Sequence, residues 1–378
     1  MCGISGIFSL DKPTESLKNI AHNMSQSLVH RGPDDSGIWT NKDNNLVFSH
    51  RRLAILDISD SGHQPMSSNC GRYTIVFNGE IYNHLVLRKK LESQGITHWN
   101  SSSDTEVLLE AISFWGLKLT LQKSEGMFAL ALWDSVEKKL HLARDRFGEK
   151  PIYYGYIGKD FVFASELKAL KVHPNFSNEL DRDSISNFLQ YSYIPYPNSI
   201  YKDILKLPPA KILTIDLMSN ISNFSTYWSL ETKLPNDVNN KITDESEILI
   251  TLSDKLTNAV SDQMIADVPV GAFLSGGIDS SLIVALMQKL STEKVNTFSI
   301  GFSDSDYDES HYAREVSKYL GTNHTELIVS PKELLDVVPK IPKLYDEPFA
   351  DSSQVPTFLV SQLARSNVTV AISGDGGD

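Results

Sequence analysis

The sequence has few cysteines, no long hydrophobic run and no excess of basic charge. Its 378 residues include two cysteines, Cys2 and Cys70, which are too few for a disulfide scaffold and indicate a reducing compartment such as the cytoplasm. No apolar stretch is long enough to cross a bilayer, and no basic segment followed by an apolar run marks a secretory signal. The 47 acidic residues outnumber the 35 basic ones, for a net charge of −12. This balance argues against non-specific nucleic-acid binding and against anchoring on an acidic membrane, so we expect neither partner.

A cysteine directly follows the initiator methionine, and glycines stand at positions 3 and 6. Removal of Met1 would leave Cys2 with a thiol and a free α-amine. That amine has a reference pKa of about 7.7–8.0, so part of it is an uncharged base near neutral pH. A nucleophile needs such a base within reach, which makes Cys2 a candidate nucleophile. The alternative, a small buried cysteine without chemistry, stays open from this stretch alone, and we interpret Cys70 as structural.

Four downstream positions carry groups that suit the attack of a thiolate on the amide of an amino acid. The side-chain amide of Asn78 and the N–H of Gly79 could stabilise an oxyanion. Arg51 offers a planar fork for a carboxylate, and Asp104, in the first turn of a predicted helix, offers a counter-charge for an ammonium. Each also has an ordinary interpretation: a hairpin turn at Asn78-Gly79, a solvated arginine, and an acid at a helix start.

The pattern of elements predicts two domains. Over residues 2–215 the predicted strands far outnumber the helices, and we expect two stacked antiparallel sheets with helices outside them. Residues 216–246 are rich in Asn, Ser, Lys and Asp and are predicted to form a linker. From residue 247 to 378 strands alternate with helices, which is typical of a parallel sheet.

The first strand of this second domain opens into Ser275-Gly276-Gly277-Ile278-Asp279-Ser280-Ser281 and then into a helix. Glycines and hydroxyls at a helix start form an anion-binding cradle of N–H groups. Asp279 adds negative charge to that cradle, and a Mg²⁺ ion between Asp279 and phosphates would resolve the conflict. The segment lacks the Gly-Lys-Ser/Thr ending of a Walker A loop. A plain Gly-Ser turn is the alternative.

Five segments of the first domain resemble the class II glutamine amidotransferases, which are N-terminal nucleophile hydrolases with an αββα sandwich. They are MCGISGIF at the start, HRGPDDSG at 30–37, HRRLAILD at 50–57, FNGEIYN at 77–83 and SDTE at 103–106. The resemblance implies that Cys2 is the nucleophile, that Asn78 and Gly79 form the oxyanion hole, and that Arg31 helps to shape a closing loop. It also implies a set of glutamine-binding residues: Arg51, Arg52, Leu53, Ala54, Ile55, Asn78, Gly79, Glu80 and Asp104.

The Ser275–Ser281 segment resembles the PP-loop of ATP pyrophosphatases. Together with the glutaminase-like half, it makes the chain similar to the glutamine-hydrolysing asparagine synthetases. That resemblance implies Mg²⁺ ligation by Asp279 and Asp378, and the transfer of ammonia from glutamine to the β-carboxylate of aspartate, activated by ATP as an adenylate. The ATP-binding residues implied are Leu274, Ser275, Gly276, Gly277, Asp279, Ser280, Ile300, Ser373 and Gly374.

Two departures from the family pattern leave alternatives open. Asp375 stands where well-studied members carry Glu near the activated carboxylate, so a sugar acid or a natural-product precursor could be the acceptor. The chain ends at Asp378, before the segments that close the family's synthetase domain, so we expect an incomplete domain and keep glutaminase activity alone as an alternative. Asp346-Glu347-Pro348 and Asp351-Ser352-Ser353 are candidates for acceptor or nucleotide contacts, or else form a polar loop. The oligomeric state is open, with a homodimer as one candidate.

Overall fold

The computed structural model describes residues 1–378 except 44, 218, 220, 233–243, 304–307 and 377–378. The chain divides into two compact units. The first contains residues 1–234 together with Asp346–Phe349, and the second contains residues 235–345 and 350–378. Among the described helices, none combines the length and the apolar content that a bilayer crossing requires.

The first unit is built on two six-stranded antiparallel sheets. In the first sheet the strand order is β10-β8-β9-β1-β3-β2, and in the second it is β12-β11-β7-β6-β5-β4. The first sheet comprises β1 (Gly3–Phe8), β2 (Asp35–Thr40), β3 (Leu46–Arg52), β8 (Tyr153–Ile157), β9 (Asp160–Ala164) and β10 (Ile204–Lys206). The second comprises β4 (Met66–Ser67), β5 (Tyr73–Ile81), β6 (Gly126–Asp134), β7 (Lys139–Arg144), β11 (Lys211–Asp216) and β12 (Ile221–Thr226).

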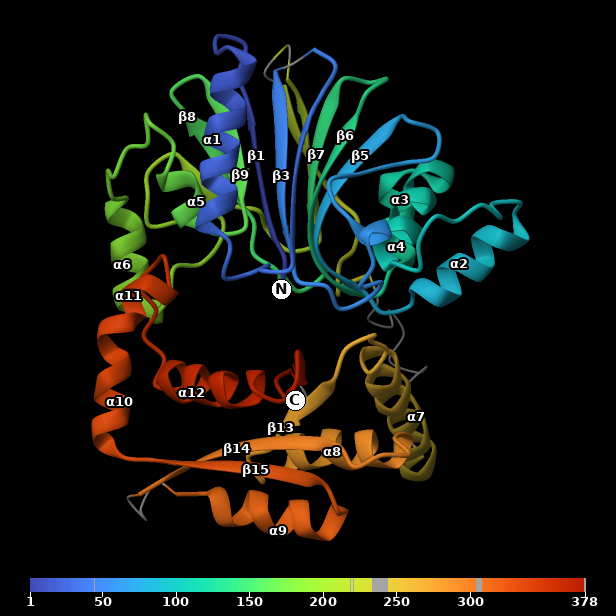
Figure 1. Cartoon of the computed structure of the whole chain (residues 1–378), viewed down its shortest axis with the longest axis vertical. Helices are drawn as coiled ribbons and strands as arrows, with labels where there is room; N and C mark the ends of the chain where they lie inside the picture. The colour runs from blue at the N-terminus through green and yellow to red at the C-terminus, as the bar shows by residue number, and fades with distance from the viewer. Residues whose placement is uncertain (44, 218, 220, 233–243, 304–307, 377–378) are drawn as a thin grey trace. The chain divides into compact units, whose positions relative to one another are not determined.

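Helices cover the outer face of each sheet, as Figure 1 shows for α1 and α5 on one side and α3 and α4 on the other. The helices and the 3₁₀ turn of this unit are α1 (Thr14–Ser27), η1 (Asp60–Gly62), α2 (His84–Ser93), α3 (Asp104–Trp115), α4 (Leu117–Lys123), α5 (Leu167–Lys171) and α6 (Arg182–Tyr191). The buried side chains follow the same layering. One cluster, which includes Phe48 and Val76, lies between the sheets; a second joins α3 to the second sheet; a third joins α1 to the first sheet. The predicted αββα sandwich is confirmed.

The second unit has a parallel sheet with the order β15-β14-β13-β16. Its elements are α7 (Glu245–Gln263), β13 (Val270–Phe273), α8 (Ile278–Leu290), β14 (Asn296–Phe302), α9 (Ser310–Leu320), β15 (Asn323–Val329), α10 (Pro331–Val337), η3 (Val338–Lys340), α11 (Ile341–Leu344), α12 (Gln354–Arg365) and β16 (Val370–Ile372). Val260 of α7, Met287 of α8 and Ala313 of α9 pack in one cluster with Ala272 of β13. Ala364 of α12 packs in another with Phe298 of β14. The predicted α/β parallel-sheet domain is therefore confirmed.

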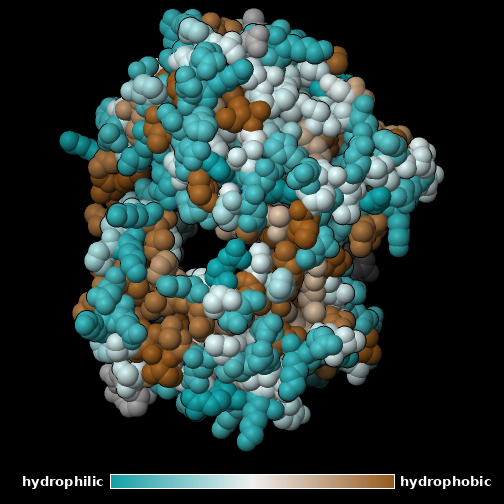
Figure 2. Space-filling view, viewed as in Figure 1, coloured by the Kyte–Doolittle hydropathy of each residue, from teal (hydrophilic) through white to brown (hydrophobic). Residues whose placement is uncertain are grey.

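The surface of the second unit is more apolar in one region than the rest of the face in view. Figure 2 shows hydrophobic side chains gathered near α10, and Leu335 of α10 and Val338 of η3 are largely exposed.

One boundary differs from the prediction. The predicted linker starts at residue 216, but β12 pairs along β11 from Lys211↔Thr226 to Asp216↔Ile221. This pairing extends the second sheet by one edge strand, so the first unit continues past residue 215. The short, polar strand ISNFST has weak alternation, which is why the sequence favoured a linker. Much of the remaining linker falls outside the described residues.

Candidate active site

Cys2 lies directly before β1, which is an interior strand of the first sheet. β1 pairs with β3 from Gly3↔Arg51 onward and with β9 on its other side. The Leu53 N–H donates to the Cys2 Sγ atom at 3.4 Å, and the Sγ lies 3.7 Å from the Leu53 carbonyl oxygen. The Arg31 Nε donates to the Cys2 carbonyl oxygen at 2.9 Å. Two-sided strand pairing and these contacts fix the position of the thiol.

A pocket surrounds this thiol and brings most of the predicted glutaminase residues together. The predicted residues that line it are Cys2, Arg52, Leu53, Ile55, Asn78, Gly79, Glu80 and Asp104. Other residues of the lining include Met1, Gln64, Ser103, Thr105, Met127 and Lys150.

Asn78 and Gly79 lie within β5 rather than in a hairpin turn, so the turn interpretation of this dipeptide is wrong. Asn78 is fully buried, and neither its Nδ2 nor its Oδ1 has a hydrogen-bond partner among the described residues. Buried side-chain amides are normally satisfied, so an unpaired one beside a thiol indicates a donor held ready for a ligand. At Gly79 a Cβ atom would collide with the Met127 carbonyl oxygen, so only glycine fits.

Arg51 and Arg52 are consecutive on β3, so their side chains point to opposite faces. The Arg51 Nε donates to the hydroxyl and the carbonyl oxygen of Ser25 on α1, at 3.0 and 3.2 Å, and Arg51 does not line the pocket. The choice of Arg51 as the carboxylate fork is therefore corrected, because it is Arg52 that lines the pocket. Ala54 also lies outside the lining, and its N–H donates to Asp34 at 2.9 Å.

The guanidinium of Arg52 is held by backbone carbonyl groups. Its Nη1 donates to Ser59 at 2.8 Å, and its Nη2 donates to Leu56 at 3.3 Å and to Asp57. Arg52 is buried, yet its positive charge has no carboxylate partner within ion-pair distance among the described residues. A buried cation that faces a pocket without a counter-ion suits the carboxylate of a bound ligand.

Two buried carboxyl groups lie in the same pocket. Burial raises the pKa of Asp104, and the Ile81 N–H, which donates to its carboxylate at 2.8 Å, lowers it in part. Burial, followed by repulsion from Asp104, raises the pKa of Glu80 to about 8, while Lys150 opposes the shift. Two acids in one pocket with raised pKa values would both be stabilised in their charged form by a ligand ammonium group.

The thiol itself is difficult to ionise in this setting. Burial raises the pKa of Cys2, while the α-ammonium of Met1 and the Leu53 N–H lower it in part. Met1 lines the pocket and is half exposed. Its removal would clear part of the pocket and place the α-amine on Cys2 itself, within reach of the thiol proton.

Several residues of this lining were not among the predicted site residues, and Gln64 and Lys150 are two of them. Gln64 is buried, and its Oε1 accepts from the N–H of Phe77, the residue before Asn78, at 2.7 Å. Nothing in its sequence context marked it. Lys150 lies between β7 and β8, outside the five segments that carry the family resemblance. Burial lowers its pKa, which is unusual for a lysine and could have drawn attention only once its place in the pocket was known.

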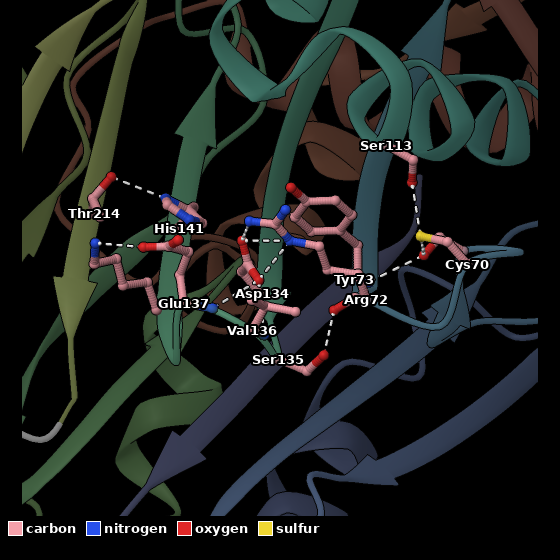
Figure 3. Close-up of polar contacts among 12 residues, drawn as sticks. Cys70, Arg72, Tyr73, Ser113, Asp134, Ser135, Val136, Glu137, His141 and Thr214 are labelled. Atoms are coloured by element: carbon pink, nitrogen blue, oxygen red, sulfur yellow. Dashed lines mark hydrogen bonds and ion pairs between the residues drawn. The ribbon is translucent and has the colours of Figure 1, made fainter.

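Cys70, the other cysteine, lies apart from this pocket and is exposed. Figure 3 shows its thiol directed at Ser113, with Sγ and Oγ 3.8 Å apart, in a polar region that also contains the ion pair of Arg72 with Asp134. A hydroxyl of Ser68 lies 3.3 Å from the same sulfur. Cys2 and Cys70 therefore have different surroundings, and only Cys2 adjoins the unpaired amide of Asn78.

A second pocket lies at the carboxyl ends of β13 and β16, which are parallel neighbours. The predicted nucleotide residues that line it are Leu274, Ser275, Gly277, Asp279, Ser280, Ile300, Ser373 and Gly374, with Asp375 beside them. Gly276 is outside the lining but supports the loop with a φ of +86°, which favours glycine. Asp378 lies outside the described residues.

Hydroxyl groups brace this loop against the start of α8. The Ser275 and Ser280 Oγ atoms are 2.9 Å apart, and the Ser275 N–H donates to the Ser280 Oγ at 3.2 Å. A Cβ at Gly374 would lie 2.8 Å from the Ser280 nitrogen, so the β16 loop approaches the helix start closely because it carries no side chain there. Exposed N–H groups at a helix start, in a loop at the carboxyl end of a parallel strand, are the arrangement that binds phosphates.

Residues 346–357 contribute to two different parts of the structure. Asp346 and Glu347 make their contacts within the first unit, so the expectation of acceptor or nucleotide contacts is not met by them in this structure. Ser353 lines the second pocket, together with Pro356 and Thr357 of α12.

Comparisons with known proteins agree with both halves of this description. Residues 1–228 match the family model of the glutamine amidotransferase domain, and residues 251–378 match that of asparagine synthase. Asparagine synthetase [glutamine-hydrolyzing] 1 of Bacillus subtilis is 37% identical over the whole chain, which spans 58% of that protein's length. Putative asparagine synthetase [glutamine-hydrolyzing] 2 of Methanocaldococcus jannaschii is 38% identical, and the chain spans 74% of it. A putative asparagine synthetase [glutamine-hydrolyzing] of Mycobacterium bovis is 35% identical over 94% of this chain and 55% of its own length.

Proposed function

Because the chain belongs to the family of glutamine-hydrolysing asparagine synthetases, we propose that its first unit hydrolyses glutamine at Cys2. In the proposed reaction the α-amine of Cys2, freed by removal of Met1, accepts the thiol proton. The sulfur then attacks the side-chain carbonyl carbon of glutamine and forms a tetrahedral oxyanion. Its collapse, with return of the proton to the leaving nitrogen, releases ammonia and leaves a thioester. Water attacks the thioester, and the products are glutamate and the free thiol.

The observation that carries this proposal is the unpaired amide of Asn78. Its Nδ2 is buried with no partner among the described residues, and together with the Gly79 N–H it would donate to the oxyanion. Donors placed in advance at the site where charge develops lower the barrier without reorganisation cost during the reaction. A purely structural asparagine would be expected to have its own hydrogen bonds in the folded chain.

The charged ends of glutamine would be bound by the remaining groups of the pocket. We assign the α-carboxylate to Arg52 and the α-ammonium to Asp104, with Glu80 beside it. The raised pKa values of the two acids fall when an ammonium binds, so glutamine would enter with release of a proton near neutral pH. Cys2 must remain a free thiol, which is why a reducing compartment such as the cytoplasm is part of the proposal.

For the second unit we propose that ATP binds in the pocket at β13 and β16, with its phosphates on the Ser275–Ser281 loop. Asp279 in the first turn of α8 would reach a Mg²⁺ ion bound to those phosphates. We propose that this ion takes most of its other ligands from the nucleotide and water. Asp375 lines the same pocket and is the proposed acid near the acceptor.

The whole proposed reaction joins the two halves. ATP would transfer AMP to the β-carboxylate of aspartate with release of pyrophosphate, and ammonia from glutamine would displace AMP to give asparagine. Asp375 in place of a longer glutamate is the reason to keep other carboxylates as alternative acceptors. Pyrophosphate release measured across a panel of carboxylates identifies the acceptor, and aspartate is the one expected.

The glutaminase proposal has a matched test in the chain's two cysteines. Cys2→Ala is expected to abolish release of glutamate from glutamine, because it removes the thiol that lines the pocket with Asn78. Cys70→Ala is expected to retain it, because Cys70 lies outside the pocket. Full activity in Cys2→Ala would overturn the proposal.

A further inference from the structure

A chain of alternating charges begins at the backbone of Cys2 and ends at Asp346. The Arg31 Nε donates to the Cys2 carbonyl oxygen at 2.9 Å, and its Nη1 donates to the Glu166 Oε1 at 2.6 Å. The Lys168 ammonium pairs with the Glu166 Oε2 at 2.8 Å and lies 3.5 Å from the Asp346 Oδ1. The Lys168 N–H donates to the Asp346 Oδ2 at 2.8 Å. Four side chains of alternating charge, Arg31, Glu166, Lys168 and Asp346, thus follow one another from Cys2 outward, and we call these four residues the relay.

The members of this relay are shielded from solvent. Relative exposures of the side chains are 9% for Arg31, 16% for Glu166, 23% for Lys168 and 12% for Asp346. Burial alone would raise the pKa of Glu166, but its bonds to His30, Arg31 and Lys168 overcome that effect and hold its pKa well below the usual range. Glu166 is therefore charged at neutral pH, and it is shared between Arg31 on one side and Lys168 on the other.

The last member comes from a distant part of the sequence. Asp346 belongs to the segment Asp346–Phe349, which the contacts assign to the first unit although the residues on either side belong to the second. Glu347 anchors the same segment independently. Its carboxylate pairs with Lys206 at 2.6 Å and accepts from the Tyr153 hydroxyl at 3.2 Å and from the Ile200 N–H at 2.7 Å. None of these three partners of Glu347 belongs to the relay.

We propose that Glu166 and Asp346 are positioning residues of the glutamine site, which act through Lys168 and Arg31 on the backbone of Cys2. The inference rests on the proposed glutaminase function. It makes cleavage of glutamine depend on a segment that continues directly into the second unit, so this segment takes part in the first half of the reaction without touching its substrate.

The direction of the effect follows from charge sharing on Glu166. Asp346→Asn keeps an oxygen that can accept from the Lys168 N–H but removes the negative charge beside the ammonium. With that charge gone, the Lys168 ammonium pairs more strongly with Glu166 and competes with Arg31 for that carboxylate. A weaker hold of Arg31 on Glu166 loosens its bond to the Cys2 carbonyl oxygen, and the thiol is less well aligned with Asn78.

The test compares Asp346→Asn with Glu347→Gln in the full chain. Glu347→Gln removes an ion pair of the same segment but leaves the relay intact, so it controls for general loosening. We expect Asp346→Asn to lower kcat for glutamine hydrolysis by about tenfold with little change in KM, because misplacement of a nucleophile by a fraction of an ångström costs rate while the glutamine-binding groups are untouched. Glu347→Gln is expected to stay within twofold of the unmodified chain, and Glu166→Gln to fall further than Asp346→Asn.

Thermal unfolding of each variant separates loss of fold from loss of alignment, and Cys2→Ala in the same assay separates the inference from the function on which it rests. Equal kcat values for Asp346→Asn and Glu347→Gln, or a change in KM alone, would overturn the relay while leaving the glutaminase proposal standing. Undiminished hydrolysis by Cys2→Ala would overturn the glutaminase proposal itself.

Discussion

For the replacement of Asn78 by alanine, the structure predicts a large fall in kcat but only a small change in the free energy of unfolding. As an oxyanion donor, the amide should be worth a factor of about 100 to 1,000 in kcat, the range found when one such donor is removed. The Gly79 N–H would remain, so activity should fall by this factor rather than vanish. KM should change little, because the oxyanion exists in the transition state and not in bound glutamine.

The same substitution should cost little stability. Removal of one partner from a satisfied buried hydrogen bond destabilises a protein by about 1–3 kcal/mol, because the other partner is left unpaired. Asn78 has no partner among the described residues, so its removal leaves no orphan group behind. Loss of the side-chain volume and relief of the unpaired amide act in opposite directions, and we expect a small net change in the free energy of unfolding.

Asn41 provides the matched control. It is buried in the same unit, and its Oδ1 accepts from the N–H groups of Asn45 and Leu46, each at 3.0 Å. Asn41→Ala should lose about 1–3 kcal/mol of stability and keep kcat, the reverse of Asn78→Ala. Glutamate release under saturating glutamine and denaturant unfolding measure the two effects. A fall in kcat of less than fivefold for Asn78→Ala, or a loss of stability as large as that of Asn41→Ala, would refute the assignment of Asn78 to the oxyanion hole.

Other predictions concern protonation and the nucleotide loop. The pKa of Glu80 is about 8 in the folded chain and near 4.5 in the unfolded chain. The folded state therefore holds an extra proton between these values, and the protein loses stability as pH rises from 4.5 to 8. In denaturant titrations, Glu80→Gln should reduce the decline of the free energy of unfolding with pH by up to about 1.4 kcal/mol per pH unit. Burial lowers the pKa values of His50 and His141 to about 4 from 6.5, so these groups take away stability as pH falls from 6.5 to 4, and His141→Gln should flatten that decline. Gly276→Ala should weaken ATP binding at least tenfold in calorimetry, because φ is +86° and a Cβ would lie 2.6 Å from the backbone nitrogen of Ala313. An affinity equal to that of the unmodified chain would contradict the account of the loop.

Short-range patterns in the sequence predicted the layers of the fold and most of the site. The start of α3 is an example. Ser103 and Glu106 have the identities and the spacing of a capping box, and the Ser103 hydroxyl accepts from the Glu106 N–H at 3.2 Å. The Glu106 carboxylate, however, accepts from the N–H groups of Asn100 and Ser101, which lie before the cap. The second half of a capping box depends on the path of the preceding loop, and that path is not a local property.

The incorrect predictions for Asn78-Gly79 and Arg51 also result from contacts that are not local in the sequence. Asn78-Gly79 has the composition of a turn, but pairing with β6 on one side of β5 keeps it extended, and its meaning depends on a neighbour about 50 residues away. Arg51 and Arg52 are chemically equal in the sequence. Only the register Gly3↔Arg51 and the alternation of β3 decide which of them faces the pocket. A shift of the strand register by one residue would exchange the two arginines, and no pattern within HRRLAILD fixes that register.

The contacts of Asp346 and Glu347 were beyond prediction for a different reason. Hydrogen bonds across 147 to 178 residues leave no periodic trace in a single sequence. The sequence could mark the acidic segment as unusual, but its partners Lys168 and Lys206 carry no signal of their own.

The most direct measurement is peptide mapping by mass spectrometry after treatment of the active chain with a glutamine-like electrophile. The chain has two cysteines, so Cys70 is an internal control for non-specific reaction. The account predicts that the label is found on Cys2, that the labelled peptide lacks Met1, and that excess glutamine prevents the labelling. A label on Cys70 alone, or an active chain that retains Met1, would contradict it.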